Sequence, residues 1–363
     1  MSDLSNERLL FIPHEWEIGD QSGPRHTFHS LRVRGCLLEY EAYSLYARLR
    51  EISYEAALQE LLAVARRLQP TLILWQHPGH LDIPSEVLEP LRRNAYLVYH
   101  EADIYGRLQK RLPLGARRLA KASDVVFTVG MGTQAEIMRH AGAKSVGFVP
   151  SSVDLSRFGT EWEPTADRPF DVAMIGNRVS SRIPMMRGLP GARRREQLAT
   201  SLGRMLGGRL ALYGAGWDGF TGARGPIHFS HQERTARDAW LVASWDHFDR
   251  VPYFFSNRLP ISLVSGVAHV TNSHPGYEHL FQDGRELFLT TSVEGSVERI
   301  ADLLDGPRDH LNDVACRGEL MARKYLASHV VFEEVLRMSV RHREGKKLPP
   351  PSAWTSNVDS HTD

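Results

Sequence analysis

Histidine and carboxylate side chains follow two apolar segments of the chain, at the point where each segment ends. His77 follows one apolar run, and the stretch 99–103 (Tyr-His-Glu-Ala-Asp) closes the next. A histidine with its ordinary pKa of about 6.5 suits general base work at neutral pH. Because acidic side chains flank it, His100 is the first candidate for a catalytic base. His77, Glu101 and Asp103 are candidates for binding the acceptor, the group that loses the proton.

A glycine-containing loop, residues 15–25, follows the first apolar run. Gly19 could admit an acceptor close to the backbone, and Asp20 could act on a proton, so we add them to the acceptor-binding and catalytic candidates. The plainer interpretation carries weight, because the chain has 17 histidines and most of them must serve the surface or the core. No pair of histidines has convincing metal-ligand spacing, so we expect no bound metal.

Two glycine turns later in the chain could hold a phosphorylated ligand. Gly176, Asn177 and Arg178 end one apolar run, and a second turn has Tyr213, Gly214 and Trp217. Glycine at the end of a strand lets a ligand approach the backbone, and an arginine can pair with a diphosphate. Each turn alone is more simply an ordinary connection between a strand and a helix.

The segment Ser256–Phe281 is more specific. Asn257 and Arg258 stand immediately before an apolar helical run that ends in glycine. A short strand follows, and then comes the sequence Gly276-Tyr277-Glu278. The N-terminus of a helix carries about half a positive charge and unpaired amides, which suits a phosphate. The ordered set therefore predicts an anion-binding site.

Short apolar runs alternate with helical patterns through most of the chain, which predicts the elements that would position these residues. The predicted strands are 9–12, 71–75, 95–99, 125–129, 142–149, 170–175, 209–213, 267–271 and 287–290. One predicted helix begins after Ser53, and three others cover 193–206, 297–304 and 332–343. Continuous apolar strands separated by helices favour parallel sheets covered on both faces.

A loop rich in Pro, Asp, Glu and Thr, residues 151–169, divides this pattern into two halves. We therefore expect an α/β fold of two Rossmann-like domains that face a central cleft, since ligands bind beyond the carboxyl ends of parallel strands. The expected boundaries are 1–160 for an acceptor domain and 161–325 for a donor-binding domain. A C-terminal helix, 326–345, and a disordered tail, 346–363, complete the prediction.

The composition is that of a globular protein. The chain has 363 residues, of which 42% are hydrophobic and 24% charged, and its formal net charge of +1 excludes a strong overall field for a polyanion. The two cysteines are far apart in the sequence, which favours a reducing compartment. We find no signal peptide and no apolar run of about 20 residues, so we expect a cytoplasmic protein without stable membrane insertion.

The segment Ser256–Phe281 resembles the donor-binding signature of GT-B glycosyltransferases, in the spore-maturation, glycosyl-transferase-family-1-like branch. The matching residues are Asn257, Arg258, Gly266, Pro275, Gly276, Glu278, Leu280 and Phe281. Residues 149–154, with Phe158, resemble the loop that leaves the first domain of these enzymes. The family usually has a ribose-binding glutamate in the helix after the arginine, and Ile261 stands there in this chain.

The resemblance implies transfer of a sugar from a nucleotide-sugar co-substrate to an acceptor hydroxyl, without a metal or other cofactor, and it favours retention at the sugar carbon. It places the donor against the two glycine turns and the segment around Arg258. It also implies donor contacts for Tyr277 and a donor-binding or catalytic role for Glu278. The acceptor could be a small molecule, a glycan or DNA.

Three alternatives stay open. The arginine-rich stretch 178–195 could bind DNA, which would make the chain a sugar transferase that acts on modified bases. Ile261 could indicate a non-catalytic nucleotide-sugar-binding protein. A nicotinamide oxidoreductase ranks last, because the pattern that begins at Gly214 does not open a helix around Gly219.

Overall fold

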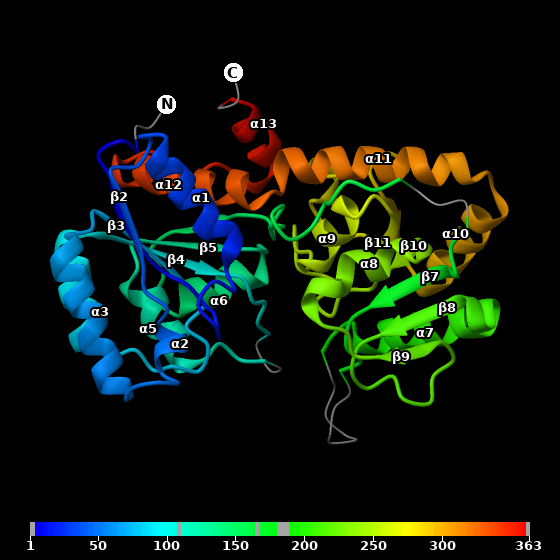
Figure 1. Cartoon of the computed structure of the whole chain (residues 1–363), viewed down its shortest axis with the longest axis horizontal. Helices are drawn as coiled ribbons and strands as arrows, with labels where there is room; N and C mark the ends of the chain where they lie inside the picture. The colour runs from blue at the N-terminus through cyan, green and yellow to red at the C-terminus, as the bar shows by residue number, and fades with distance from the viewer. Residues whose placement is uncertain (1–3, 107–109, 164–166, 180–188, 361–363) are drawn as a thin grey trace. The chain divides into compact units, whose positions relative to one another are not determined.

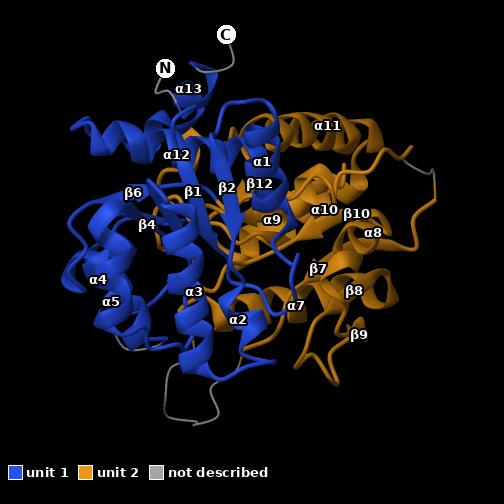
Figure 2. Ribbon diagram, turned by 60° about the vertical axis from the view of Figure 1, so that its left-hand side comes forward, with its two compact units in different colours: residues 1–150, 328–363 blue, residues 151–327 orange. Residues whose placement is uncertain are grey.

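The computed structural model describes residues 4–106, 110–163, 167–179 and 189–360. The chain divides into two compact units, residues 1–150 with 328–363 (unit 1) and residues 151–327 (unit 2) (Figure 2). Arg182 and Arg187 of the arginine-rich stretch lie outside the described residues.

Unit 1 is built on a six-stranded parallel sheet with the order β2-β1-β3-β4-β5-β6 (Figure 1). Its strands are β1 (Arg8–Ile12), β2 (Glu39–Ala42), β3 (Leu72–Gln76), β4 (Tyr96–Glu101), β5 (Val125–Thr128) and β6 (Val146–Phe148). Its α-helices are α1 (Ser22–Val33), α2 (Leu45–Arg48), α3 (Tyr54–Leu68), α4 (Ser85–Asn94), α5 (Leu114–Ala122), α6 (Thr133–His140), α12 (Ser328–Arg343) and α13 (Trp354–Asp359).

Strand alternation assigns the two faces of this sheet. Phe11 packs against Phe28 of α1, and Phe28 packs against Phe332 of α12, so these two helices share one face. In each strand, the residues at alternate positions point to the opposite face of the sheet. Tyr99 of β4, for example, belongs to the core beneath α3, α4 and α5 on that other face. Successive residues of one strand therefore serve different cores.

Unit 2 repeats the architecture with the strand order β12-β11-β10-β7-β8-β9, also parallel. Its strands are β7 (Phe170–Ile175), β8 (Leu210–Tyr213), β9 (Ala223–Gly225), β10 (Ala239–Ala243), β11 (Ala268–Asn272) and β12 (Phe288–Thr290). Its α-helices are α7 (Ala192–Leu206), α8 (Gln232–Arg237), α9 (Arg258–Val264), α10 (Val293–Asp305) and α11 (Arg308–Tyr325). Helices α7 and α10 pack together, and α9 packs between α8 and α11.

The expected α/β architecture of two Rossmann-like halves is confirmed. Ser53 caps α3 by accepting a hydrogen bond from the amide of Ala56, as the sequence indicated. The structure adds the edge strand β2, whose polar sequence hid it, and β10, which lies in the interior of the unit 2 sheet.

The C-terminal segment differs from its expected disorder. The last helices belong to unit 1, and α13 follows a single turn of 3-10 helix, η4 (Pro351–Ala353). Trp354 and Val358, one helical turn apart, are both buried, and the Trp354 ring lies 6.4 Å from that of Phe148. These two apolar side chains, on one face of α13, anchor the C-terminal segment, although its Lys, Pro and Ser content predicted disorder.

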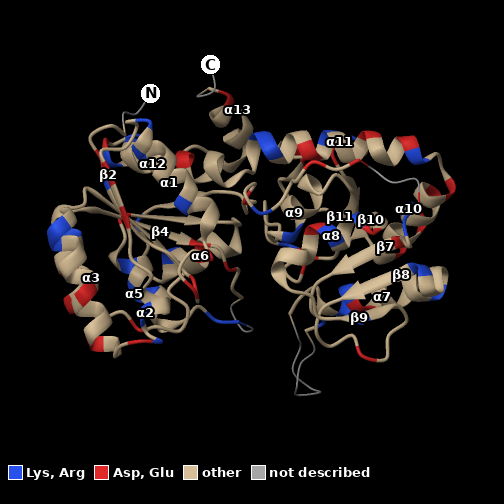
Figure 3. Cartoon of the chain, in the orientation of Figure 1, with Lys and Arg blue, Asp and Glu red and all other residues tan. Residues whose placement is uncertain are grey.

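Acidic and basic residues are interspersed over both units (Figure 3). Within the described part of the chain, no helix combines the length and apolar character that crossing a membrane requires.

Candidate functional site

The two glycine turns of unit 2 pack directly against each other. A Cβ atom on Gly214 would lie 2.5 Å from the carbonyl oxygen of Gly176. The indole of Trp217 donates a hydrogen bond to that same oxygen at 2.7 Å, and the Asn177 side chain accepts one from the Ala215 amide at 2.9 Å. Trp217 and Asn177 therefore hold the two turns together.

Two guanidinium groups converge on Gly176. A Cβ atom there would lie 3.2 Å from Nη1 of Arg195 and 3.5 Å from Nε of Arg258. Arg195 reaches this place from α7, where its Nε donates to the Trp245 carbonyl at 2.7 Å. Burial, together with the neighbouring Arg258 charge, lowers the pKa of Arg195 to about 10. Burial also lowers the pKa of Arg258.

One buried carboxylate, that of Asp246, lies within the field of both arginines. Burial alone would raise its pKa, but His274, whose Nε2 lies 3.3 Å from Oδ2, and the two guanidinium groups hold it below its usual range. The Asp246 amide donates to Asn272 at 2.8 Å, which fixes the start of this loop. Two cations facing one anion leave an excess positive charge, so the turn at Gly176 suits a negatively charged ligand.

The remaining donor-binding candidates are less directly placed. Arg178 pairs with Glu196 at 3.1 Å, and its guanidinium lies 5.0 Å from the Phe220 ring centre. Tyr213 is partly buried, and burial raises its pKa. Asn257 precedes α9, a helix of only seven residues with a correspondingly small dipole.

The loop after β11 is organised by its own contacts. Tyr277 is fully buried, and its hydroxyl donates to the Phe254 carbonyl at 2.7 Å, so its ring is part of the core. Gly276 adopts a φ of 94°, and its amide donates to Glu278 at 3.0 Å. The Glu278 side chain is 69% exposed. The loop places Glu278 in solvent, where it caps the turn.

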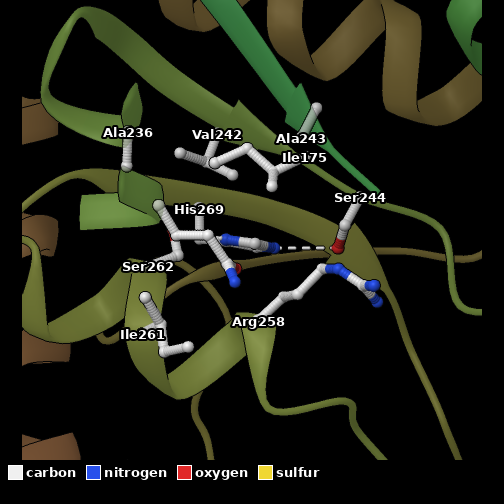
Figure 4. Close-up of a pocket in the computed structure, with 10 residues that line it drawn as sticks. Ile175, Ala236, Val242, Ala243, Ser244, Arg258, Ile261, Ser262 and His269 are labelled. Atoms are coloured by element: carbon white, nitrogen blue, oxygen red, sulfur yellow. Dashed lines mark hydrogen bonds between the residues drawn. The ribbon is translucent and has the colours of Figure 1, made fainter. Parts of the chain in front are cut away.

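A pocket beside Arg258 lies between the sheet and helices α8 and α9 (Figure 4). Its apolar lining residues are Ile175, Ala236, Val242, Ala243 and Ile261. His269 lies at its base, and its two ring nitrogens bond Ser262 and Ser244, each at 2.8 Å. Burial lowers the pKa of His269 to about 4, so its ring is neutral. Ile261 thus gives an apolar wall where the resemblance leads one to expect a carboxylate.

In unit 1, the ends of β3 and β4 bring His77 and Glu101 together. Nδ1 of His77 lies 2.9 Å from Oε2 of Glu101, which is fully buried. The Glu101 carboxylate also accepts hydrogen bonds from the hydroxyls of Tyr99 and Tyr105 and, at 2.8 Å, from the Asp103 amide. These donors fix the position of the Glu101 carboxylate, and Glu101 in turn fixes the orientation of the His77 ring.

The His77 ring is prepared to take up a proton at Nε2. With Nδ1–H donating to Glu101, the neutral ring carries its lone pair on Nε2, which lies 4.0 Å from the Asp103 carboxylate. Burial acts to lower the pKa of His77, but the hydrogen bond and charge of Glu101, with the charge of Asp103, outweigh it and raise the pKa above 6.5. This arrangement is that of a general base oriented by a carboxylate.

The position of His100 does not support the prediction that it is the base. Its ring is 6% exposed, packs edge-on against Phe332 of α12, and has no hydrogen-bond partner for either nitrogen among the described residues. Burial lowers its pKa to about 4. Because adjacent strand residues point to opposite faces, His100 and Glu101 are directed apart, and the partner of Glu101 comes from the next strand.

The loop after β1 also differs from its prediction. It is organised around the buried carboxylate of Glu15, which accepts hydrogen bonds from the amides of Gly19 and Gln21 at 3.3 and 3.2 Å. Asp20 is exposed and accepts from the Glu17 amide at 3.0 Å. The Gly19 amide is therefore already bonded, and Asp20 closes its own turn rather than joining the His77–Glu101 pair.

Several residues of both sites were missed from the sequence. Arg195 belongs to the arginine-rich stretch considered for DNA binding, and only the register of α7 shows that it turns inward. His14, whose ring lies 4.9 Å from that of His77, follows the apolar strand β1, and Asp246 follows β10. A search of every strand end for polar side chains would have found both.

The fold of this chain has counterparts among solved structures. No protein-family model and no curated protein sequence matches the chain. HepE from Anabaena, in complex with UDP and glucose, has a TM-score of 0.58 at 13% identity, with 91% of this chain and 98% of that chain covered. A glycosyltransferase from Rickettsia africae ESF-5 has a TM-score of 0.59 at 8% identity, with 94% and 100% covered.

Sucrose-phosphate synthase from Thermosynechococcus elongatus gives a TM-score of 0.50 at 13% identity, over 85% of this chain and 82% of that chain. At such identities the likeness concerns architecture, and no sequence match supports the spore-maturation branch in particular. The fold of this chain is the GT-B fold.

Proposed function

We propose that this protein is a glycosyltransferase that moves a sugar from a nucleoside diphosphate sugar to an acceptor hydroxyl. Unit 2 binds the donor and unit 1 binds the acceptor. The observation that carries the proposal is the convergence of Arg195 and Arg258 on Gly176, with the buried Asp246 as a counter-charge to both. The solved structure of HepE with UDP and glucose supports a nucleotide-sugar ligand for this fold.

The two guanidinium groups stabilise the diphosphate as it leaves. Negative charge grows on the leaving group when its bond to the sugar breaks, and fixed donors aimed at that charge lower the barrier. Because Arg195 and Arg258 supply the charge, we propose that the reaction needs neither a metal ion nor another cofactor. Arg178 lies two residues after Gly176 on the same turn and is held by Glu196.

His77 takes the proton from the acceptor hydroxyl at Nε2 while Glu101 stabilises the imidazolium that forms. The resemblance favours retention at the sugar carbon, in which the leaving diphosphate itself serves as base. A protein base oriented by a carboxylate is what direct displacement with inversion requires, and we propose inversion on that ground. The anomeric coupling constant in the NMR spectrum of the product tests this, and a retained anomer would leave His77 to orient the hydroxyl.

The DNA alternative loses support among the described residues of the stretch 178–195. Arg194 pairs with Asp249 at 2.6 Å, Arg178 is held by a carboxylate and Arg195 is buried. A basic surface for phosphates of a duplex would need these charges free. We therefore propose a small molecule or a glycan as acceptor, in a protein that acts without membrane insertion.

A thermal-shift panel of nucleoside diphosphate sugars tests the proposal. A ligand that binds only the folded state stabilises it, by about 2.7 kcal/mol at a hundred times its dissociation constant. We expect at least one donor to raise the melting temperature and to be consumed when acceptors are added. Stabilisation without turnover by any acceptor would favour the non-catalytic binding protein, and no stabilisation by any donor would overturn the proposal.

A further inference from the structure

The loop after β1 presents large apolar side chains to solvent. Trp16 is 62% exposed and Ile18 is 67% exposed. A single exposed apolar residue is ordinary on a protein surface. Trp16 differs because it is one end of a row of ring contacts that leads to the candidate base.

The ring contacts run from Trp16 to His77. The centre of the Trp16 ring lies 5.3 Å from that of Tyr46, Tyr46 lies 4.8 Å from His14, and His14 lies 4.9 Å from His77. These four rings form one aromatic surface. Trp16, Tyr46 and His14 each contact at least two of the other rings, in edge-to-face or tilted geometry. The surface ends beside the group that removes the proton.

The surface is held in place before any ligand arrives. The Tyr46 hydroxyl donates to the Pro78 carbonyl at 3.0 Å and accepts from the His80 amide at 2.9 Å. A Cβ atom on Gly79 would overlap this hydroxyl at 1.7 Å, so the glycine is needed for the approach. Fixing rings in advance reduces the entropy lost on binding.

Polar groups surround the aromatic surface, and their charge is mainly negative. Glu17 flanks Trp16 and lies 3.6 Å from Arg50, while Asp103 lies near His77 and pairs with Lys110 at 2.8 Å. Asp20, which ends the same loop, and the buried Glu101 add carboxylates beyond these two pairs. This surplus of carboxylates disfavours a phosphorylated acceptor or an anionic lipid surface. It suits a neutral ligand with many hydroxyl groups, which carboxylates bind as acceptors of hydrogen bonds.

We propose that the acceptor is a neutral glycan, one pyranose ring of which packs its C–H face against Trp16 while a hydroxyl of the next ring meets Nε2 of His77. The inference rests on the proposed function, because it assigns the acceptor class of that same reaction. A sugar ring has an apolar face and a polar rim, and the aromatic surface with its carboxylate border is complementary to both. Trp16 is a specificity-determining residue that touches the acceptor away from the reacting hydroxyl.

The test titrates the full-length protein with neutral hexasaccharides of glucose, N-acetylglucosamine, xylose and mannose and follows tryptophan fluorescence and saturation-transfer NMR. We expect saturable binding of at least one glycan, about tenfold weaker in Trp16→Ala and largely restored in Trp16→Phe. Leu114→Ala, which removes another exposed apolar side chain of unit 1, is the matched control and should bind the glycan as the wild type does. In turnover, Trp16→Ala should raise the KM for the glycan far more than it lowers kcat.

UDP binding by the same samples separates this inference from the proposed function. If UDP binds but no glycan of the panel does, or if Trp16→Ala binds the glycan as tightly as the wild type, the acceptor assignment is overturned and the donor assignment stands. If the protein binds phosphatidylglycerol–phosphatidylcholine vesicles through Trp16 and binds no glycan, the acceptor assignment is equally overturned. If glycans bind and no nucleoside diphosphate sugar of the thermal-shift panel does, the proposed transferase activity fails while the glycan site remains.

Discussion

The candidate sites at the carboxyl ends of the two sheets differ in charge, although each sheet has six parallel strands. In unit 2, Arg195 and Arg258 face a glycine turn and share Asp246 as a counter-charge. In unit 1, Glu101 is buried beside His77, and no arginine or lysine lies within 4 Å of its carboxylate among the described residues. One architecture thus supports an anion-binding site in one unit and a proton-accepting site in the other.

In the proposed function, the two units of this repeated fold divide one reaction between them. A group-transfer step with a charged leaving group needs cations for the group that leaves and a base for the group that attacks. If both were placed on the same sheet edge, the arginines would lower the pKa of the base and the carboxylate would weaken diphosphate binding. Separate units allow each local field to be strong.

Loss of the base is expected to have the largest effect. His77→Ala should lower kcat by about 10²–10⁴-fold, because the acceptor hydroxyl loses its proton acceptor. Binding of UDP should not change, since His77 belongs to unit 1. Steady-state kinetics with the best donor measures this, and His80→Ala, an exposed histidine of the same segment, is the matched control. A kcat within tenfold of the wild type would remove His77 from the chemistry.

Loss of one guanidinium group should be nearly as damaging. Arg258→Ala should lower kcat by about 10²–10³-fold, as removal of one preorganised donor to a developing charge does. Unlike the change at His77, it should also weaken UDP binding. Arg317→Ala, which removes an exposed arginine of α11, should leave both quantities unaltered. Equal loss from both arginine variants would show that net charge, rather than position, is what matters.

The contact between the two glycine turns should contribute to the free energy of unfolding. Gly214 has a φ of 135°, and an added Cβ would meet the Gly176 carbonyl at 2.5 Å. Gly214→Ala should therefore lower the free energy of unfolding by about 1–3 kcal/mol from strain alone, with the clash in addition. Gly219→Ala, at a positive φ of 81° with no atom within 4 Å of the added Cβ, isolates the strain. Chemical denaturation compares the two, and equal losses would mean that the turns do not press on each other.

The dependence of kcat on pH should show whether Glu101 raises the pKa of His77. The base works when neutral, so activity should fall as the pH drops through the raised pKa of His77. Glu101→Gln removes the hydrogen bond and the charge that raise this pKa, while burial, which lowers it, persists. The acidic limb of kcat against pH should therefore move to lower pH, with a reduced plateau. A limb that stays in place would assign it to another group.

The smallest effect is expected at Glu278. Its side chain is 69% exposed and caps the turn at Gly276. Glu278→Ala should change kcat/KM for the donor by no more than about the few tenths of a kcal/mol typical of exposed sites. A loss of a hundredfold would show that the sequence resemblance located a donor contact that the turn conceals.

The sequence predicted the architecture well because its signal is local. Apolar runs such as Phe170–Ile175 coincide with strands, and strand β2 escaped only because an edge strand can be polar. The expectation that ligands bind beyond the carboxyl ends of parallel strands also pointed to the right segments. It did not identify the working side chains, since His100 and Glu101 differ by one position and therefore by a whole face of the sheet.

Residues contributed by distant elements were beyond prediction from local pattern. Arg195 reaches Gly176 from α7, and its inward direction depends on the helix register against β7 and β10. His77 gains its partner from the neighbouring strand through the β3–β4 register, in which Gln76 lies opposite His100. Such pairings follow from tertiary structure, and one sequence carries no record of them.

Calorimetric titration of a nucleoside diphosphate panel (UDP, dTDP, GDP and ADP) into the full-length protein tests the central claim most directly. The account predicts saturable binding of at least one diphosphate, at least tenfold weaker in Arg258→Ala and unaltered in His77→Ala and Arg317→Ala. Absence of binding by every member of the panel, or equal affinity in wild type and Arg258→Ala, would contradict the assignment of the arginine pair at Gly176 as the diphosphate site.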